Sequence, residues 1–295
     1  MTHERGRWRA RARTGKVAGR TAVEPAMSSS ETVRVRVEAG RAEVRLNRPE
    51  KHNGMNLAML AAVTDCAARL RRDRGLRSVV IAGNGPSFCA GLDFASVMAR
   101  PLIAVPALAR LWLPRINRLQ RWSLGWRDIG APVIAAIRGH CLGAGLQLAL
   151  GADVRVARAD ARLSIMETRW GLVPDMGGAV LLRELVGIDT AKELTLSARI
   201  VDGREAQRLG LVTHLADEPE ARAHELAERM SRHSPDAVAA GKFLLQDAWQ
   251  AGTARAAAAE RWWQRRLIGR INQRISMRRK DASDGSPFRR RRIRR

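Results

Sequence analysis

Short apolar runs that end in glycine-bearing turns constrain the fold of this chain most strongly. Residues Ser78–Gly83 and residues 132–137 are almost entirely apolar, and a turn containing glycine follows each run. Strands without polar alternation are typical of parallel sheets that are covered on both faces. Helical patterns lie between the runs, so this order of elements predicts an α/β protein with parallel strand pairs.

Other segments fit the same class. Residues 33–37 alternate valine with arginine, and residues 42–46 alternate again after a turn, which predicts a β-hairpin. A helix is expected over residues 56–72 and short strands over 153–157 and 162–165. Helices dominate from about residue 176, apart from a strand near 211–215. Residues 1–32 lack an apolar period, so we expect a disordered basic extension, with Met27 as an alternative start.

The charge is strongly positive but unevenly distributed. The formal net charge is +24, of which +16 lies in residues 1–26 and 265–295. Only five of the 53 basic residues are lysine, a bias that a skewed genome composition produces without selection for a ligand. We therefore do not expect nucleic-acid binding, although a polyanion-binding protein that uses its Arg-rich tails stays an alternative.

Several classes of protein are disfavoured. The three cysteines (Cys66, Cys89 and Cys141) form no CxxC pair, which argues against disulfides or a zinc site and favours a reducing, cytoplasmic location. No apolar run approaches the roughly 18 residues of a membrane span. The motifs GxGxxG, GxxxxGK[ST], GxSxG and HExxH are all missing from the sequence. No bound metal is expected.

Two glycine turns and two acids are the candidates for chemistry. The turns cover residues 87–94 and 139–146, and the second opens a helix whose first N–H groups lack helical partners. Two such donors would suit a carbonyl oxygen that becomes an oxyanion. Glu167 and Asp175 lie eight residues apart among apolar residues and glycines, where burial would raise their pKa values for acid–base work. Ordinary turns, a helix cap and a salt bridge are the alternatives.

Taken together, these segments resemble the crotonase (enoyl-CoA hydratase/isomerase) superfamily, in order over roughly residues 33–280. The matching stretches are 46–49 with Asn53, 87–93, 132–145, 152–153, Glu167 with 171–174, 195–200 and 206–210. The resemblance implies a crotonase-like spiral of repeated ββα units over 33–230. It also implies a helical C-terminal trimerisation region over 231–280, followed by an Arg-rich tail over 281–295. A homotrimer or a dimer of trimers is expected, acting on an acyl-CoA thioester, with no cofactor apart from the CoA of the substrate.

The resemblance also assigns the binding residues. The oxyanion hole would consist of the backbone N–H groups of Leu92 and Ala144, where the family usually has glycine at the second position. The CoA ester would lie along Lys51, His52, Ala90, Gly91, Asp93, Phe94, Gly143 and Pro174. A basic C-terminal segment around Phe288 would meet the CoA phosphates of a neighbouring subunit.

The acidic residues decide the reaction. Hydratases of this family hold a water between two glutamates, of which the second aligns with Glu167 and the first with Gln147. An amide cannot accept the proton of that water at neutral pH. Simple enoyl-CoA isomerases use one carboxylate at the Glu167 position, and Glu167 with Asp175 is similar to the pair of dienoyl-CoA isomerases. Isomerisation of enoyl- or dienoyl-CoA is therefore favoured, with Glu167, Asp175 and Gln147 as catalytic residues. Hydration of 2-enoyl-CoA and a non-catalytic crotonase are the alternatives.

The sequence does not decide the role of one stretch. Residues 95–128 hold Trp112, Trp122 and Trp126, and three prolines interrupt any long helix. By resemblance this part of the chain lines the acyl pocket. Large aromatic side chains are equally ordinary core residues.

Overall fold

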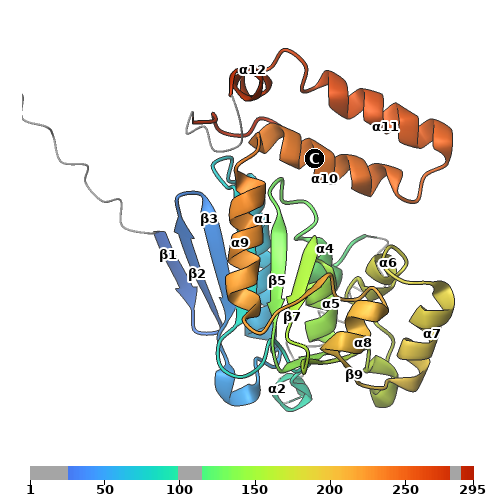
Figure 1. The fold of residues 1–295 in the computed structure, drawn as a ribbon. Helices are drawn as coiled ribbons and strands as arrows, with labels where there is room; N and C mark the ends of the chain where they lie inside the picture. Colours follow the sequence, from blue (N-terminus) through green and yellow to red (C-terminus); the bar gives the residue numbers. More distant parts are fainter. Residues whose placement is uncertain (1–25, 99–114, 280–286) are drawn as a thin grey trace, which may run out of the picture.

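The computed structural model describes residues 26–98, 115–279 and 287–295, which form two sheets covered by helices (Figure 1). The larger sheet has the order β1 (Ala26–Ser30), β2 (Val33–Glu38), β3 (Arg41–Leu46), β4 (Ser78–Gly83), β5 (Val133–Ile137), β7 (Val154–Ala157) and β10 (His214–Leu215). The smaller sheet has the order β6 (His140–Leu142), β8 (Arg162–Ser164) and β9 (Val201–Asp202). From β3 to β10 all neighbours in the larger sheet are parallel, as the apolar runs predict.

The predicted start of order at Val33 is wrong. Residues Ala26–Ser30 form strand β1, which pairs antiparallel with β2 and places Ala26 opposite Val37. The segment has no apolar alternation that a sequence pattern could detect, and it adds to the sheet through backbone pairing with the open edge of β2. The rest of the expected basic extension falls on residues 1–25, outside the described residues.

The hairpin and the first long helix are confirmed. Ala39 and Gly40 both have positive φ, 48° and 78°, which is the mirror-image turn that joins two twisted strands most readily. A 3-10 helix, η1 (Pro49–Lys51), follows β3, and helix α1 (Leu57–Arg72) begins after Asn56. The Asn56 side chain accepts a hydrogen bond from the N–H of Met59 at 2.8 Å and so caps the helix.

The chain repeats one supersecondary unit three times, which confirms the expected spiral. Each unit gives a strand to the larger sheet, makes a short contact in the smaller layer, and then turns into a helical segment. The units are β4, Cys89 and α2 (Phe94–Met98); β5, β6 and α5 (Ala144–Leu150); and β7, β8 and η3 (Glu167–Trp170). The short contacts pair Cys89 with Cys141 and β6 with β8, both in parallel, so successive units stack in register.

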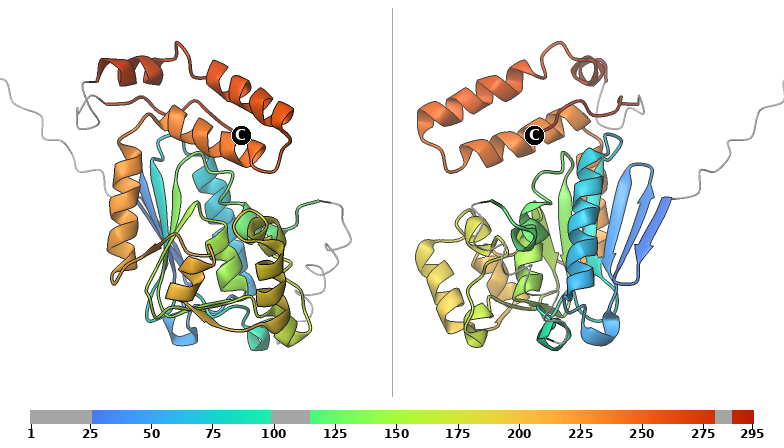
Figure 2. Two further views of the ribbon diagram at one scale, coloured as in Figure 1. Left: turned by 45° about the vertical axis from the view of Figure 1, so that its right-hand side comes forward. Right: turned by 180° about the vertical axis from the view of Figure 1, so that it is seen from behind.

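Helices cover the larger sheet on both faces (Figure 2). Helix α9 (Pro219–Ser231) lies on the face opposite α1, where Ala223, Leu226 and Ala227 pack against strands β4, β5 and β7. The remaining helices beside the spiral are α4 (Arg118–Leu124), α6 (Gly178–Leu182), α7 (Ile188–Ser197) and α8 (Gly203–Arg208). The apolar faces of the elements thereby close one main core and a smaller one under α9.

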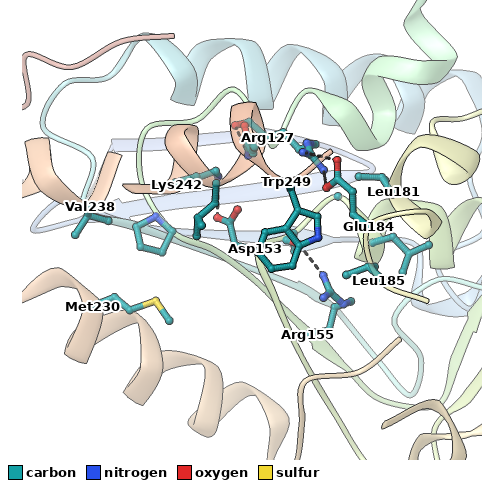
Figure 3. Close-up of a pocket in the computed structure, with 16 residues that line it drawn as sticks. Arg127, Asp153, Arg155, Leu181, Glu184, Leu185, Met230, Val238, Lys242 and Trp249 are labelled. Carbon is teal, nitrogen blue, oxygen red and sulfur yellow. Dashed lines mark hydrogen bonds and ion pairs between the residues drawn. The ribbon is translucent and has the colours of Figure 1, made fainter. Parts of the chain in front are cut away.

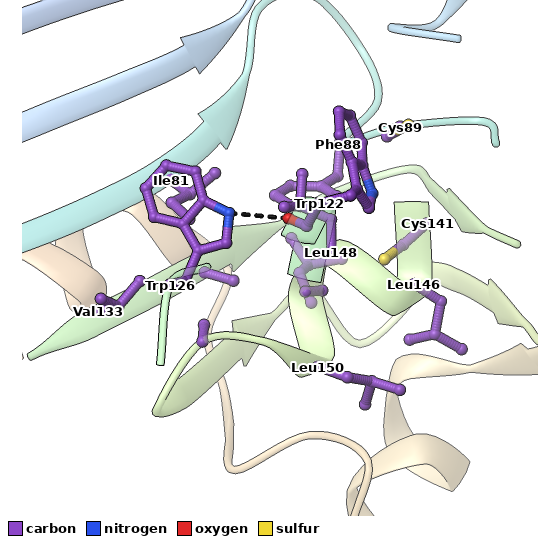
Figure 4. Packing of buried hydrophobic residues seen from close by; sticks show 14 of the residues in the cluster. Ile81, Phe88, Cys89, Trp122, Trp126, Val133, Cys141, Leu146, Leu148 and Leu150 are labelled. Carbon is purple, nitrogen blue, oxygen red and sulfur yellow. Dashed lines mark hydrogen bonds between the residues drawn. The ribbon is translucent and has the colours of Figure 1, made fainter. Parts of the chain in front are cut away.

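Two of the three tryptophans that the sequence left open belong to the core (Figure 4). Trp122 and Trp126 are fully buried, and the indole N–H of Trp126 donates to the carbonyl oxygen of Trp122 at 3.0 Å. The indole N–H of Trp122 donates to the carbonyl oxygen of Ala144 at 2.8 Å, which anchors the start of α5. Trp112 lies outside the described residues.

The cysteines are free thiols, and all three are buried. Burial raises the pKa of Cys66 to about 11 and that of Cys89 to about 12. Thiols with such pKa values carry almost no thiolate at neutral pH, so they act as small apolar side chains. Within residues 26–98, 115–279 and 287–295, no helix is long and apolar enough to cross a membrane. Cytoplasmic location stays a prediction.

A separate helical layer lies over one end of the larger sheet. It consists of α10 (Pro235–Ala248), α11 (Thr253–Arg265) and α12 (Ile271–Arg278), and residues 287–295 run back along it (Figures 1 and 2). Asp236, only 3% exposed, accepts hydrogen bonds from the backbone N–H groups of Arg292 and Ile293 and from the side-chain amide of Asn272. This end of the Arg-rich tail is therefore bound to its own chain.

Two further residues of the tail, Arg291 and Phe288, also contact the rest of the chain. Arg291 is 2% exposed and donates to the carbonyl oxygens of Ile293 and Asp73. The ring of Phe288 lies between two guanidinium groups, 3.9 Å from that of Arg279 and 5.5 Å from that of Arg77. Arg77 and Arg279 thus already have a partner within the chain.

Replacing Asp236 with alanine should lower the free energy of unfolding by about 2–4 kcal/mol, because three donors, two of them buried, lose their acceptor. Chemical denaturation followed by circular dichroism measures the change. Asp189→Ala is the matched control, since Asp189 holds the same second position of helix α7 but is exposed. Equal stability of the two variants would contradict a structural role for the docked tail.

Candidate active site

The two glycine turns that the sequence singled out lie against each other. The backbone N–H of Leu142 donates to the carbonyl oxygen of Cys89 at 3.0 Å. Gly91 has a φ of +99°, and a Cβ atom there would lie 2.9 Å from the carbonyl oxygen of Leu142 and 4.0 Å from the backbone nitrogen of Ala144. A Cβ at Gly145 would lie 2.3 Å from the carbonyl oxygen of Cys89. Glycine at these positions is what lets the two backbones touch.

The contact leaves two N–H groups without a partner. Around Leu92, the N–H of Met55 donates to Gly91 and the N–H of Asp93 donates to Met55, but the N–H of Leu92 donates to no described residue. Ala144 stands at the first position of α5, where a helix provides no acceptor, and its N–H likewise has no described partner. The structure brings the turns that carry both predicted oxyanion donors together, and their role stays a prediction.

Glu167 approaches the same turn from the third unit. A Cβ at Gly143, whose φ is +49°, would lie 3.4 Å from Oε1 of Glu167. Oε1 accepts a hydrogen bond from the side-chain amide of Gln147 at 2.6 Å, whereas Oε2 is buried and has no partner among the described residues. Burial is the main cause that raises the pKa of Glu167, and the charge of Asp175 raises it further, while the Gln147 hydrogen bond opposes the shift. A buried, unpaired carboxylate oxygen is a candidate proton acceptor.

Short contacts fix the segment that carries Glu167. The hydroxyl of Thr168 donates to the carbonyl oxygen of Thr195 at 2.6 Å, which ties η3 to helix α7. Gly171, with a φ of +70°, ends η3, and the N–H of Leu172 closes the turn by donating to the carbonyl oxygen of Glu167 at 3.0 Å. The carboxylate is thus attached to a braced turn of the backbone.

Gln147 connects the acidic residues. It is 2% exposed, and its Oε1 accepts hydrogen bonds from the backbone N–H groups of Met176 and Gly178, both at 2.9 Å. Its Nε2 donates to Glu167. One amide therefore joins Glu167 to the backbone that follows Asp175.

Asp175 differs from the expectation. The sequence suggested that both acids are buried, but Asp175 is exposed, because it lies in the surface loop that crosses from η3 to α6. Partial burial still raises the pKa of Asp175, and the field of its carboxylate acts on Glu167. Pro174, the preceding residue, is half-buried.

Six of the eight residues expected to hold the CoA ester fall on two adjoining segments, whereas Gly143 precedes α5 and Pro174 lies between η3 and α6. Lys51 and His52 are exposed at the end of η1, and the N–H of Ala90 donates to the carbonyl oxygen of His52 at 2.9 Å. The carboxylate of Asp93 is taken up by an ion pair with Arg48 at 3.0 Å. Hydrogen bonding to Ser96, together with Arg48, lowers the pKa of Asp93. This carboxylate therefore braces the turn.

Sequence reasoning missed several side chains at these turns. The hydroxyl of Ser87 lies 3.0 Å from Nδ1 of His52 and 3.2 Å from Nδ1 of His140, and burial lowers the pKa of His140. The rings of Phe94 and Trp170 pack with centroids 5.0 Å apart, which links α2 to η3. Trp170 could have been suspected from its place three residues after Glu167. The Ser87–His140 contact spans 53 residues and has no local signal.

A cavity of about 400 Å³ lies elsewhere, between helix α10 and the end of the spiral (Figure 3). It contains none of the residues that the sequence predicted for the site. Its acids are paired: Asp153 lies 2.7 Å from Nζ of Lys242, and Glu184 lies 2.5 Å from a guanidinium nitrogen of Arg127. With its acids held by cations, this cavity offers no free proton acceptor and is not the candidate site.

Known proteins resemble this chain over most of its length. A sequence model of the family described as Enoyl-CoA hydratase/isomerase matches residues 36–279. Enoyl-CoA hydratase domain-containing protein 2 of Bos taurus, a mitochondrial protein, is 34% identical over 213 residues, which cover 70% of this chain and 70% of that protein. The mitochondrial Delta(3,5)-Delta(2,4)-dienoyl-CoA isomerase of Mus musculus is 35% identical over 212 residues, which cover 68% of this chain and 64% of that protein.

Solved structures agree with the sequence comparisons. The crystal structure of an enoyl-CoA hydratase from Mycobacterium smegmatis superimposes with a TM-score of 0.75 at 27% identity, covering 84% of this chain and 95% of that chain. The residues that the family model matches include the three stacked units. They also include both glycine turns and Glu167. This chain is a member of the enoyl-CoA hydratase/isomerase family, and the resemblance to the crotonase superfamily is confirmed.

Proposed function

We propose that this enzyme moves a double bond in an enoyl- or dienoyl-CoA through an oxyanion-stabilised enolate. One observation carries the proposal: Oε2 of Glu167 is buried without a partner among the described residues, beside the turn in which the N–H of Ala144 also has no described partner. A thioester oxygen bound by the N–H groups of Leu92 and Ala144 would have its α-carbon near that acid. Such an arrangement suits removal of a carbon-bound proton.

The first step transfers a proton from C2 of a 3-enoyl-CoA to Oε2 of Glu167. The electron pair of the broken C2–H bond moves into the C1–C2 bond, and the thioester oxygen gains the negative charge. The two backbone donors stabilise this charge, because fixed donors need no reorganisation as the charge develops. The raised pKa of Glu167 makes it a stronger base than a solvated carboxylate.

The second step returns a proton at C4. The electron pair moves back from the oxygen, C2 and C3 become doubly bonded, and the C3–C4 double bond takes up the proton. We assign the delivery of this proton to Asp175, because its exposed carboxylate can take up a proton from water and pass it to C4, while Glu167 gives its own proton back to water. The proposed chemistry uses no cofactor apart from the CoA of the substrate.

Hydration is the second candidate, because the relatives include proteins named as hydratases. A hydratase-type water needs two acceptor groups, and Gln147 occupies one of the two positions. Its carbonyl oxygen already accepts two backbone hydrogen bonds, and its amide donates to Glu167. This engagement favours isomerisation over addition of water.

The CoA part of the substrate is proposed to lie along the segments 51–54 and 90–94. These segments adjoin because the N–H of Ala90 bonds to His52, and Lys51 presents an exposed ammonium group suited to a phosphate. The acyl group would then enter between Gly91 and Gly143, toward Glu167.

The chain is further proposed to assemble as a homotrimer or a dimer of trimers. Leu245 on α10, Trp249 directly after α10 and Trp262 on α11 are all more than half exposed, which is unusual for large apolar side chains. Size-exclusion chromatography with light scattering should give three or six times the chain mass of 32.6 kDa. Leu245→Glu with Trp249→Glu should shift the mass toward one chain, whereas the exposed polar control Gln250→Glu should not. A wild-type monomer would overturn this proposal.

Glu167→Gln should reduce kcat for 3-enoyl- and 3,5-dienoyl-CoA by about 10³-fold or more, because the amide retains the shape but cannot take the proton. Asp175→Asn should reduce kcat by about 10²–10⁴-fold. Activity of the wild type should fall at low pH as Glu167 becomes protonated, and because its pKa is raised, this fall should begin at a higher pH than a solvated glutamate would give. The absorbance of the conjugated product measures all three.

The same assay separates the alternatives. Loss of crotonyl-CoA absorbance on adding enzyme would indicate hydration, whereas isomerisation of a 3-enoyl-CoA creates the conjugated chromophore. CoA-ester binding without turnover on either substrate would favour the non-catalytic alternative. Salt-sensitive binding of RNA without CoA affinity would favour the polyanion alternative.

Ala144→Pro tests the second oxyanion donor. Proline is tolerated at the first position of a helix, so this change removes one N–H while α5 keeps its hydrogen bonds. We expect kcat to fall by about 10²–10³-fold with little change in thermal stability. Ala144→Gly keeps the N–H and should retain most of the activity. Full activity of a folded proline variant would exclude this donor.

A further inference from the structure

The orientation of the Gln147 amide is fixed by its surroundings. Its carbonyl oxygen faces two N–H donors, those of Met176 and Gly178, at 2.9 Å each. A reversed amide would place N–H groups against those donors and an oxygen against the carboxylate of Glu167, so three hydrogen bonds would be lost at once. The side chain can therefore present only its N–H group to Glu167.

This one-sided contact distinguishes the two oxygens of Glu167. Oε1 receives the amide N–H at 2.6 Å, while Oε2 remains buried without a partner. A neutral donor stabilises the ionised carboxylate without adding charge, and it occupies the oxygen that is not needed for the reaction. The unoccupied oxygen is then the one that meets the substrate.

The second half of the amide controls the loop of Asp175. Met176 is held on both sides, since its N–H donates to Gln147 and its carbonyl oxygen accepts from the hydroxyl of Ser123 at 2.5 Å. The approach is close enough that a Cβ at Gly178 would lie 2.7 Å from Oε1 of Gln147. Asp175 is bonded directly to Met176, so the Gln147 amide also limits where that acid can lie.

We propose that Gln147 is a positioning residue that keeps Glu167 as the proton acceptor and Asp175 as the proton donor of the pair. The inference rests on the proposed isomerase function and explains how two acids at one substrate keep different roles. Asp175 supplies the charged group that acts on Glu167, and Gln147 supplies a neutral side-chain contact. A carboxylate in place of the Gln147 amide would share a proton with Glu167 and remove this distinction.

The test compares the pH dependence of kcat in variants of Gln147. Gln147→Glu should shift the acid limb for 3-enoyl-CoA upward by roughly 1–3 pH units, since two adjacent carboxylates resist double ionisation. Gln147→Met removes both hydrogen-bonding groups at similar size, and it should shift the limb upward and lower kcat. Gln207→Glu is the matched control, because Gln207 is exposed on α8, and its limb should stay at the wild-type position.

A second readout does not depend on turnover. In protein with ¹³C-labelled glutamate carboxyl groups, the Glu167 signal is identified by its loss in Glu167→Gln and titrated by NMR. An upward shift of its midpoint in both Gln147→Glu and Gln147→Met is the expected result. An unchanged midpoint in folded variants would overturn the role of Gln147. Absence of isomerase turnover in the wild type, with the midpoint still shifted in the variants, would overturn the proposed function instead.

Discussion

The close contact of two backbone turns is the constraint on which the site depends. Cys89 and Cys141 pair as parallel neighbours between successive units, and Gly91 and Gly145 permit an approach that any side chain would prevent. Among the residues that the structure describes, the N–H groups of Leu92 and Ala144 on these turns have no partner. These are the two donors that the proposed oxyanion hole would use.

The spiral explains why Glu167 lies beside the turns that carry Leu92 and Ala144. Leu92, Ala144 and Glu167 each follow the short contact of their own unit, and the units stack in register through parallel pairing. Equivalent positions of stacked units lie side by side, so residues far apart in sequence meet without a special connection. The buried tryptophan beneath α5 holds the middle unit in this position, because Trp122 bonds to the carbonyl oxygen of Ala144.

Electrostatics at the site depend on a neutral link between two acids. Gln147 bonds to Glu167 and to the backbone beside Asp175, and it adds no charge to a partly buried region. Elsewhere the chain is rich in arginine, yet residues 291–293 of the tail bind to the rest of the chain. Arg291 is buried, and Asp236 binds the backbone of residues 292 and 293. The high net charge therefore indicates less about ligands than its size suggests.

Sequence alone determined the elements and the kinds of groups at the site. Apolar runs fixed the parallel strands, glycines marked the turns, and the family motifs placed Leu92, Ala144 and Glu167. The local sequence pattern did not predict strand β1, because β1 forms by pairing with β2 and its own sequence has no strand pattern. Tertiary structure decided that Trp122 belongs to the core, that Asp175 is exposed, and that Gln147 is fully engaged. Burial and hydrogen bonding depend on residues distant along the chain, and no local pattern carries that information.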